Sequence, residues 1–333
     1  MAAHRGLLGR TVGFRRITKQ FAEEIGSLRP DAIICHDLEM LWASVRAGRA
    51  LRIPVLYHAH EDWPAMVSER SRLEGLIFGL LERRLVRFVD HIYAAGEERA
   101  RRYRRWGKAV TVIYGAKSLS EMPPVSEADR LAIRAAAGFA ATDAVVGIAG
   151  SLGRDEAVPT VLDALALLPE SVKLYIVGGG ERKVAETKAL VEAGGMSSRV
   201  SFTGRLPTPE YLRQTAAIDV GLALYFPTTK NQRTVVPLKL FDYMGLGIPT
   251  VGSDFAELRR IITNLCGCGA TTDPEDPEAL RRAVEALLRD RAGRQEMGRR
   301  ARECFQTRFC QERQEEALQR SHPVFAAGAD RQG

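Results

Sequence analysis

Short β-branched runs alternate along the chain with longer segments whose apolar residues recur at helical spacing. Strands that alternate with helices pair in parallel, because each crossover helix brings the chain back to the same end of the sheet. The order of the elements therefore predicts an α/β fold made of doubly wound, Rossmann-like sheets. The expected strands lie at 31–37, 53–59, 90–96, 109–115, 144–150, 172–180, 199–204, 218–224 and 248–254.

The stretch GAKSLSEMPPVSEAD at 115–129 interrupts this alternation, because it is rich in Ser and Pro and has no sustained period. A chain of 333 residues with 45% hydrophobic content can build two domains with separate cores. We therefore expect two doubly wound domains in series. The expected boundaries are a first Rossmann-like domain at 1–116, a linker at 117–129, a second Rossmann-like domain at 130–308, a C-terminal helix that packs back on the first domain at 309–326 and a tail at 327–333.

The stretch PLKLFDYMGLGIPTVGSD at 237–254 predicts a helix, a turn and a strand. Pro237 suits the first helical turn, where an N–H group has no partner to lose, and Gly247 is typical of a helix end. The start of such a helix attracts anions, and Lys239 adds a positive charge there. Asp242 falls on about the same face, where a carboxylate can accept hydrogen bonds from the two hydroxyls of a ribose. The pattern indicates a nucleotide site, and the alternative is an acidic residue that only complements the helix dipole.

The net charge of +7 is concentrated between residues 83 and 108, where nine cations stand against three acidic residues. This segment is expected to be either a solvated helix face or a peripheral contact with an anionic membrane. Nucleic acid is not an expected partner, because the segment lacks interleaved aromatic residues for base stacking.

The five cysteines are an odd number without a disulfide-like framework, which fits a reducing compartment. Cys266 and Cys268 form a lone C-x-C without a second ligand pair, so no metal site is expected there. The sequence DLE at 37–39 is interpreted as a helix cap rather than a metal-binding pair. The longest apolar run, LIFGLL at 76–81, is too short to span a membrane. We expect a cytoplasmic protein, either soluble or peripheral on the inner membrane.

The stretch at 237–254 resembles the donor-binding segment of glycosyltransferase family 4, which has the GT-B fold of two facing doubly wound domains. The stretches at 176–224 and 266–290 resemble the following parts of that donor domain, and 30–62 resembles the acceptor-side segment. The resemblance implies a metal-independent transferase that moves a sugar from a nucleotide-diphosphate sugar to a hydroxyl with retained configuration. It also implies a saccharide or lipid-linked acceptor, a role in glycan or glycolipid biosynthesis, and no cofactor beyond the co-substrate.

The resemblance also assigns roles to single residues. His60 matches the histidine that approaches the transferred sugar, and His36 matches a more variable position that orients the loop. Lys239 at the helix start is expected to bind the diphosphate, helped by Arg154, so that His60, Arg154 and Lys239 are the expected catalytic residues. The residues expected to bind the nucleotide sugar are Gly150, Gly204, Arg205, Leu206, Thr234, Pro237, Leu238 and Asp242.

The chain departs from the family pattern at two places in the donor domain. The family usually has two glutamates where this chain has Thr234 and Asp242, and an Arg and a Lys where it has Ser151 and Glu156. Since cations stabilise the charge that develops on the departing diphosphate, their loss lowers the expected rate. The main alternative is a catalytically degenerate GT-B chain that acts as a partner subunit or a nucleotide-sugar binding module, and a nucleotide-sugar epimerase is a third. An oxidoreductase is not expected, because no G-x-G-x-x-G follows a first strand.

The first domain of the family normally opens with about three more strand-helix units, roughly 90 residues, before the segment that 30–62 resembles. We therefore expect a truncated N-terminal domain. Either the stated start is internal to a longer reading frame, or a second chain completes the sheet.

Overall fold

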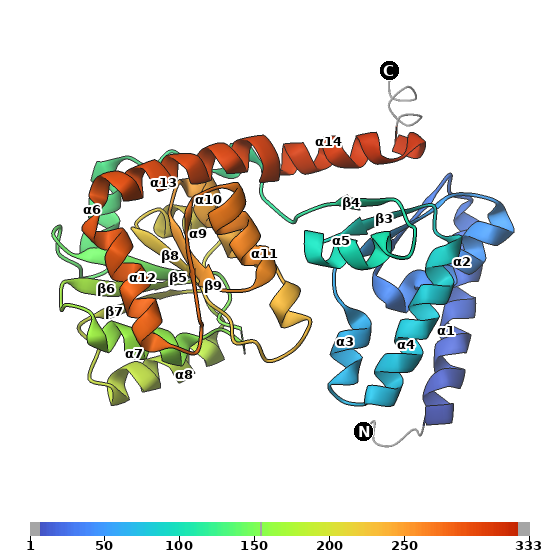
Figure 1. Ribbon diagram of the computed structural model, residues 1–333, viewed down its shortest axis with the longest axis horizontal. Helices are drawn as coiled ribbons and strands as arrows, with labels where there is room; N and C mark the ends of the chain where they lie inside the picture. Colours follow the sequence, from blue (N-terminus) through green and yellow to red (C-terminus); the bar gives the residue numbers. More distant parts are fainter. Residues whose placement is uncertain (1–6, 154, 326–333) are drawn as a thin grey trace. The chain divides into compact units, whose positions relative to one another are not determined.

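The computed structural model describes residues 7–153 and 155–325. It divides the chain into two compact units, each built on a parallel sheet with helices around it (Figure 1). The predicted α/β fold with two Rossmann-like sheets is confirmed. The N-terminal unit comprises Met1–Tyr114, Thr229–Asn231 and Glu315–Gly333, and the C-terminal unit comprises Gly115–Thr228 and Gln232–Gln314.

The sheet of the N-terminal unit has the strand order β1-β2-β3-β4 within the described residues, and all neighbouring strands are parallel. Its core is formed by alternate strand residues and the apolar face of α2, with Leu41, Tyr57 and Ile92 fully buried. The elements are α1 Leu7–Leu28, β1 Ile33–His36, α2 Asp37–Leu51, β2 Val55–Ala59, α3 Trp63–Ser68, α4 Arg72–Leu85, η1 Val86–Phe88, β3 His91–Ala94, α5 Glu97–Arg104 and β4 Val110–Val112.

The sheet of the C-terminal unit has the strand order β10-β9-β8-β5-β6-β7 within the described residues, again all parallel. The chain runs outward from β5 to β7 and returns to β8 on the other side of β5, so the order reverses between β5 and β8. Ligands of open parallel sheets bind beyond the carboxyl ends of the strands at such a switch point. The strands are β5 Ala144–Ala149, β6 Val172–Val177, β7 Val200–Gly204, β8 Val220–Ala223, β9 Thr250–Ser253 and β10 Gly269–Thr272.

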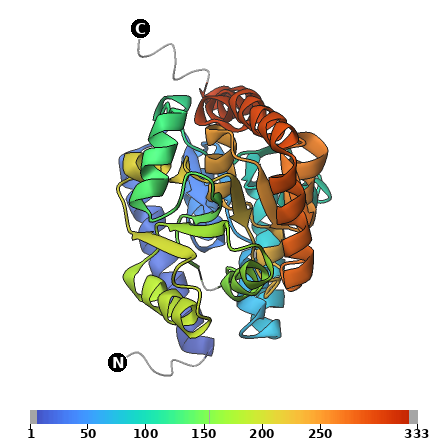
Figure 2. The same cartoon turned by 90° about the vertical axis from the view of Figure 1, so that its left-hand side faces the viewer.

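Helices cover both faces of this second sheet, because successive strand residues point to opposite sides. Val146 of β5 packs into a core with α7 and α12, whereas its neighbour Val145 packs with α6 and with Tyr243 of α10. Figure 2 shows α6 (green) and α12 (orange) on opposite sides of the strands. The helical segments are η2 Leu119–Glu121, α6 Glu127–Ala136, α7 Val158–Leu167, α8 Glu181–Ala193, α9 Thr208–Thr215, η3 Gln232–Thr234, α10 Leu238–Leu246, α11 Ala256–Arg259, η4 Arg260–Leu265, α12 Pro277–Arg289, α13 Arg291–Cys304, η5 Phe305–Phe309 and α14 Gln311–Ser321.

The expectation that the cysteines form no disulfide is wrong for one pair. Cys266, which follows η4, is joined to Cys304 at the end of α13, with a Cα–Cα distance of 5.8 Å and a sequence separation of 38. Cys35, Cys268 and Cys310 are buried free thiols. Since disulfides are rare in reducing compartments, the cysteines no longer favour such a compartment.

None of the helices within residues 7–153 and 155–325 is both long and apolar enough to cross a membrane. α4 has a stripe of apolar residues, but it has only 14 residues.

Candidate functional site

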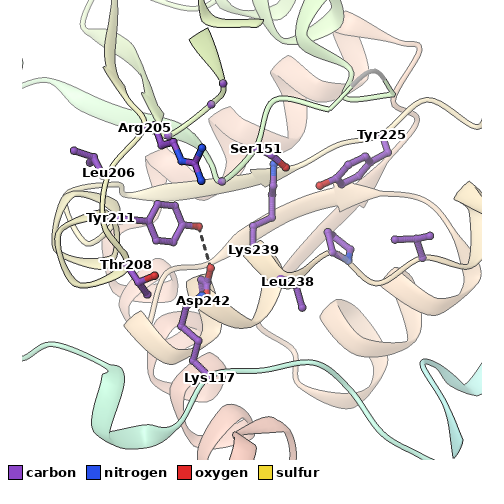
Figure 3. Close-up of a pocket in the computed structure, with 16 residues that line it drawn as sticks. Lys117, Ser151, Arg205, Leu206, Thr208, Tyr211, Tyr225, Leu238, Lys239 and Asp242 are labelled. Atoms are coloured by element: carbon purple, nitrogen blue, oxygen red, sulfur yellow. Dashed lines mark hydrogen bonds and ion pairs between the residues drawn. The ribbon is translucent and has the colours of Figure 1, made fainter. Parts of the chain in front are cut away.

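A cavity of about 650 Å³ lies at the carboxyl ends of the strands in the C-terminal unit (Figure 3). It opens beside the switch point of the sheet, between the turns that follow β5 and β6 and the first turn of α10. This is the size of a typical small-molecule site. The residues that line it are Lys117, Gly150, Ser151, Gly178, Gly179, Gly180, Arg205, Leu206, Thr208, Tyr211, Tyr225, Val235, Pro237, Leu238, Lys239 and Asp242.

Two glycine turns form one wall of this cavity. Gly150 follows β5 with φ +90°, and Gly178 follows β6 with φ +99°, a region that side chains other than glycine rarely adopt. A Cβ atom on Gly178 would lie 2.7 Å from the carbonyl oxygen of Gly150, so the two turns can pack this closely only without side chains. The wall therefore exposes backbone, which lets a ligand approach it closely.

The first turn of α10 forms the facing wall. Pro237 is the N-cap residue, and the helix runs from Leu238 to Leu246 before Gly247 ends it in the left-handed conformation, with φ +71°. The predicted helix with its proline start and glycine end is confirmed. The N–H groups of a first helical turn have no partner within the helix and carry partial positive charge. The cavity thus receives the positive end of α10.

Asp242 of α10 is buried in this wall and uses both carboxylate oxygens. Its Oδ1 accepts a hydrogen bond from the Lys117 ammonium at 2.5 Å, and its Oδ2 accepts one from the Tyr211 hydroxyl at 2.9 Å (Figure 3). Burial and the nearby carboxylate raise the pKa of Tyr211, so this hydroxyl keeps its proton and donates. Asp242 is therefore held in one orientation at the cavity surface.

Lys239 lines the same cavity but is already paired. Its ammonium lies 2.6 Å from Oε1 of Glu156, and only 6% and 4% of the two side chains are exposed. Burial raises the pKa of Glu156 more strongly than the nearby ammonium lowers it. Among the described residues, Oε2 of Glu156 has no hydrogen-bond partner. The positive charge of Lys239 is thus largely balanced before any ligand binds.

The cavity brings together most of the residues that the sequence assigned to nucleotide-sugar binding. Gly204 and Thr234 do not line it: Gly204 ends β7, and Thr234 is half-buried in η3. Arg154 lies outside the described residues. The residues that line it as predicted are Gly150, Arg205, Leu206, Pro237, Leu238, Lys239 and Asp242.

Sequence reasoning missed Lys117, Tyr211 and Tyr225 in this cavity. Lys117 lies in the segment interpreted as a linker and reaches Asp242 across 125 residues of sequence, so no local pattern marks it. Tyr211 lies on α9, which follows the segment at 204–206 that was expected to bind the nucleotide sugar, and this position is the one signal that could have identified it.

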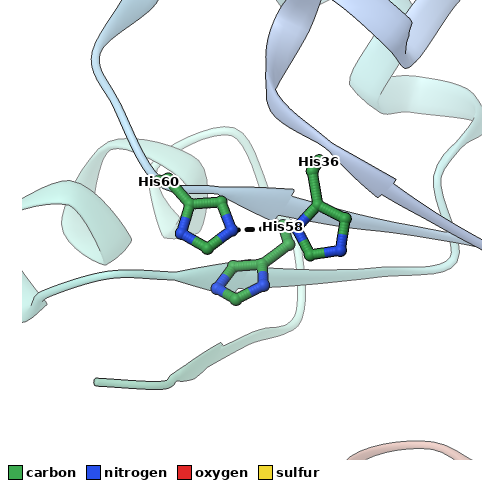
Figure 4. A group of neighbouring side chains, drawn as sticks. All are labelled: His36, His58 and His60. Atoms are coloured by element: carbon green, nitrogen blue, oxygen red, sulfur yellow. Dashed lines mark hydrogen bonds between the residues drawn. The ribbon is translucent and has the colours of Figure 1, made fainter. Parts of the chain in front are cut away.

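The N-terminal unit holds His60 in a group of three histidines (Figure 4). Nδ1 of His36 lies 2.8 Å from Nε2 of His60, and the ring centroids of His58 and His60 are 3.8 Å apart. Burial and the neighbouring histidines lower the pKa of His58 to about 3, and burial is also the main cause that lowers the pKa of His60. At neutral pH these two rings are therefore uncharged.

The loop that carries His60 is fixed by charged side chains of the same unit. Asp37, which has φ +56°, accepts hydrogen bonds from the backbone N–H groups of His60 and Glu61 at 2.9 and 3.2 Å. The Arg99 guanidinium donates to the carbonyl oxygen of His60 and, at 3.1 Å, to the amide oxygen of Asn231. Asp37 therefore holds the His60 loop, and the interpretation of its side chain as a cap of its own helix is wrong, since the N-cap position is His36 without a side-chain cap.

Two family models match the chain, "Glycosyl transferases group 1" over residues 143–290 and "Glycosyltransferase Family 4" over residues 3–117. The chain belongs to the family 4 glycosyltransferases. The resemblance stated from the motifs is confirmed.

Solved structures of glycosyltransferases share its fold. The chain is similar to Anabaena Alr3699/HepE in complex with UDP, with 20% identity, a TM-score of 0.71, and coverage of 92% of this chain and 81% of that one. It is similar to sucrose-phosphate synthase from Thermosynechococcus elongatus, with 21% identity, a TM-score of 0.72, and coverage of 94% and 78%. It is also similar to WaaG, a glycosyltransferase involved in lipopolysaccharide biosynthesis, with 15% identity, a TM-score of 0.58, and coverage of 93% and 96%. These similarities establish the GT-B fold. No curated protein matches the chain at a significant level.

Proposed function

We propose that this glycosyltransferase moves a sugar from a nucleoside-diphosphate sugar to a hydroxyl acceptor with retained configuration, in the synthesis of a glycan or glycolipid. The observation that carries the proposal is the fixed Asp242 carboxylate, which shares one cavity with the positive start of α10. The similar Alr3699/HepE was solved in complex with UDP and with UDP-glucose, which supports a nucleotide-sugar donor.

In this proposal the parts of the donor follow the chemistry of the cavity walls. The diphosphate lies against the first turn of α10, whose N–H groups attract anions. The ribose hydroxyls donate to Asp242, which requires Lys117 to share or release Oδ1. The base lies beside Arg205 and Leu206, which follow β7.

The reaction needs charge stabilisation more than a protein base. As the bond between the anomeric carbon and the diphosphate oxygen breaks, negative charge grows on the leaving group, and the nearby cations of the cavity are Lys117, Arg205 and Lys239. The acceptor hydroxyl forms its bond on the same face and passes its proton to the leaving diphosphate, so no metal or cofactor is required. The family resemblance assigns His60 of the N-terminal unit to the transferred sugar, and this role stays a prediction.

The deciding experiment is calorimetric titration of the chain with UDP, GDP and dTDP in EDTA. Asp242→Asn keeps the shape of the side chain and the hydrogen bond from Tyr211 but removes the charge, and Asp163→Ala on the exposed face of α7 is the matched control. We expect one nucleotide to bind wild type and the control alike, and Asp242→Asn to weaken it at least about tenfold, since hydrogen bonds to a charged group contribute about 1.5–3 kcal/mol. Failure of a folded chain to bind any of the three would overturn the proposal.

Transfer is then measured with the sugar nucleotide of the bound base, and the anomeric configuration of the product is read by NMR. A product with inverted configuration would contradict the retaining assignment. Release of free epimerised sugar without transfer would indicate an epimerase instead.

A second candidate is a chain that binds the nucleotide sugar without transferring the sugar. The ion pair of Lys239 with Glu156 favours it, because it withdraws one cation from the leaving group. Tight nucleotide binding without turnover, across acceptors that related enzymes use, would support this candidate.

We propose that the N-terminal unit contacts an anionic membrane through α4. Leu73, Leu76, Ile77 and Leu80 are exposed on one stripe of this helix, with 62% of Leu73 accessible, and the exposed Arg83 and Arg84 follow in its last turn. An apolar stripe with arginines beside it fits a lipid surface with anionic headgroups.

The segment at 83–108 contributes less free charge to this surface than its composition predicts. Arg99 is buried, Arg102 pairs with Asp62 and Glu82, and Lys108 donates to backbone carbonyls.

A second chain that pairs with the outer edge of β1 stays a prediction, which light scattering would test.

A further inference from the structure

His36, His58 and His60 converge because of strand register. His36 of β1 is the parallel partner of His58 of β2, so the two rings leave the sheet on the same side. His60 lies one residue beyond the end of β2, and its ring centroid is 3.8 Å from that of His58. One ring nitrogen from each histidine lies within 4.8 Å of the others. Figure 4 shows the three rings side by side.

The spacing of these nitrogens is close to that of a metal site. Zinc binds imidazole nitrogen at about 2.0–2.1 Å, so two nitrogens on one tetrahedral ion lie roughly 3.4 Å apart. His36 and His60 are at 2.8 Å, and small rotations of exposed or half-buried rings bring all three nitrogens into range. Imidazole ligands favour Zn²⁺, Co²⁺ or Ni²⁺ over Mg²⁺ or Ca²⁺.

The backbone around these rings is held in place by other groups. Asp37 accepts from two N–H groups of the His60 loop, and Arg99 donates to its carbonyl oxygen. Arg99 also brings a positive charge, which opposes a cation, but Asp37 at the start of α2 and Glu61 on the loop supply negative charge beside His60. A loop fixed in this way loses little freedom when an ion binds.

We propose that His36, His58 and His60 bind one zinc-class divalent ion. Such an ion occupies Nε2 of His60 and withdraws this ring from the sugar, so it inhibits transfer rather than supporting it. This consequence rests on the proposed function, whereas the binding itself does not.

The test is titration of the full chain, without a histidine tag, with Co²⁺ followed by visible absorption and with Zn²⁺ followed by calorimetry. We expect one ion per chain with the intense absorption bands of four-coordinate Co²⁺. His36→Ala and His58→Ala should each weaken binding at least about tenfold, as loss of a ligand costs no less than loss of its supporting group. His322→Ala, outside the cluster, is the matched control and should bind like wild type.

His36 is exposed, so His36→Ala keeps the test valid if the half-buried His58→Ala fails to fold. Absence of the bands, or equal affinity in wild type and His36→Ala, would overturn the site. Inhibition is measured separately as the ratio of activity with Zn²⁺ to activity with EDTA, which should approach one in His36→Ala. A chain that binds Co²⁺ at these histidines but has no nucleotide affinity would overturn the proposed function and leave the metal site standing.

Discussion

Glu156 and Lys239 form an ion pair with a 2.6 Å contact in the interior of the C-terminal unit. Lys239 lines the cavity, whereas Glu156 does not. Glu156 lies on the turn after β5, where it makes an antiparallel bridge with Tyr225, and its carboxylate reaches the Lys239 ammonium. Breaking a buried pair by removing one partner costs much more than an exposed pair contributes. The pair therefore stabilises the free protein and at the same time reduces the positive charge that Lys239 offers to a ligand in the cavity.

Glu156→Gln should make the free chain less stable and the nucleotide complex tighter. The variant leaves Lys239 as a buried cation without a counterion, which costs on the order of 3 kcal/mol. A bound diphosphate supplies the missing negative charge, so we expect roughly tenfold tighter binding, equivalent to about 1.4 kcal/mol. Thermal unfolding with and without the bound nucleotide measures both effects.

The matched control for this variant is Glu127→Gln, which removes an exposed partner of Arg130 and should change neither quantity. If Glu156→Gln instead weakens nucleotide binding, then Glu156 supports the donor site, and the interpretation that it neutralises the cavity is wrong.

Tyr211→Phe should reduce nucleotide affinity severalfold, because it removes the hydroxyl that fixes Asp242 Oδ2. The expected loss of unfolding free energy is about 1 kcal/mol, the usual contribution of one hydrogen bond. Tyr175→Phe is the control, since its hydroxyl donates to Gln214 and does not line the cavity. Calorimetry should then find weaker binding only in Tyr211→Phe, and equal affinity in both variants would exclude a role for Tyr211 in the donor site.

The membrane surface on α4 predicts that the chain sediments with vesicles that contain anionic lipid at low salt. Leu76→Glu places a negative charge in the exposed apolar stripe and should abolish sedimentation while leaving the fold intact, because this side chain is 61% exposed. Glu74→Gln on the same helix should sediment like wild type. Sedimentation that is equal for neutral and anionic vesicles, or unaffected by Leu76→Glu, would contradict the proposed contact.

The parts of the site that sequence could predict are those set by local rules. Pro237, Asp242 and Gly247 lie within one helix and its turn, so capping preferences and helical spacing place them together. Lys117 and Asp242 meet only because the chain returns after 125 residues, which depends on the order of strands rather than on any local pattern.

The same limit applies to the histidines and the cysteines. His36 and His58 are brought together by the register of β1 with β2, a relation that the spacing of 22 residues does not encode. Cys266 and Cys304 meet through the packing of α13 on its neighbours. The sequence therefore predicts the elements and their order well, and predicts contacts between distant elements poorly.

Glu82 predicts a pH dependence of stability in the N-terminal unit. This carboxylate is 1% exposed, and burial raises its pKa above the ordinary value of 4.5 despite the Arg102 guanidinium beside it. Between 4.5 and the raised pKa the folded chain keeps a proton that the unfolded chain has released. The contribution of Glu82 to unfolding free energy is therefore fully present below pH 4.5 and falls as the pH rises through the folded pKa.

Glu82→Gln should remove this slope, because glutamine does not titrate. Denaturant unfolding of wild type and variant across pH 4 to 8 measures the difference between the two curves. Glu127→Gln is again the control, and a wild-type curve parallel to that of Glu82→Gln would show that Glu82 titrates alike in both states.

The disulfide predicts that reduction destabilises the C-terminal unit. Cys266 and Cys304 close a loop across a sequence separation of 38, for which the chain-entropy relation gives about 4 kcal/mol of stabilisation. Cys304→Ser should therefore lower the unfolding temperature of the untreated chain, and dithiothreitol should lower that of wild type to the same value. Dithiothreitol should change nothing further in Cys304→Ser, which is the internal control. Thiol titration of the denatured, unreduced chain should find three thiols of the five cysteines, and five would show that the pair is reduced.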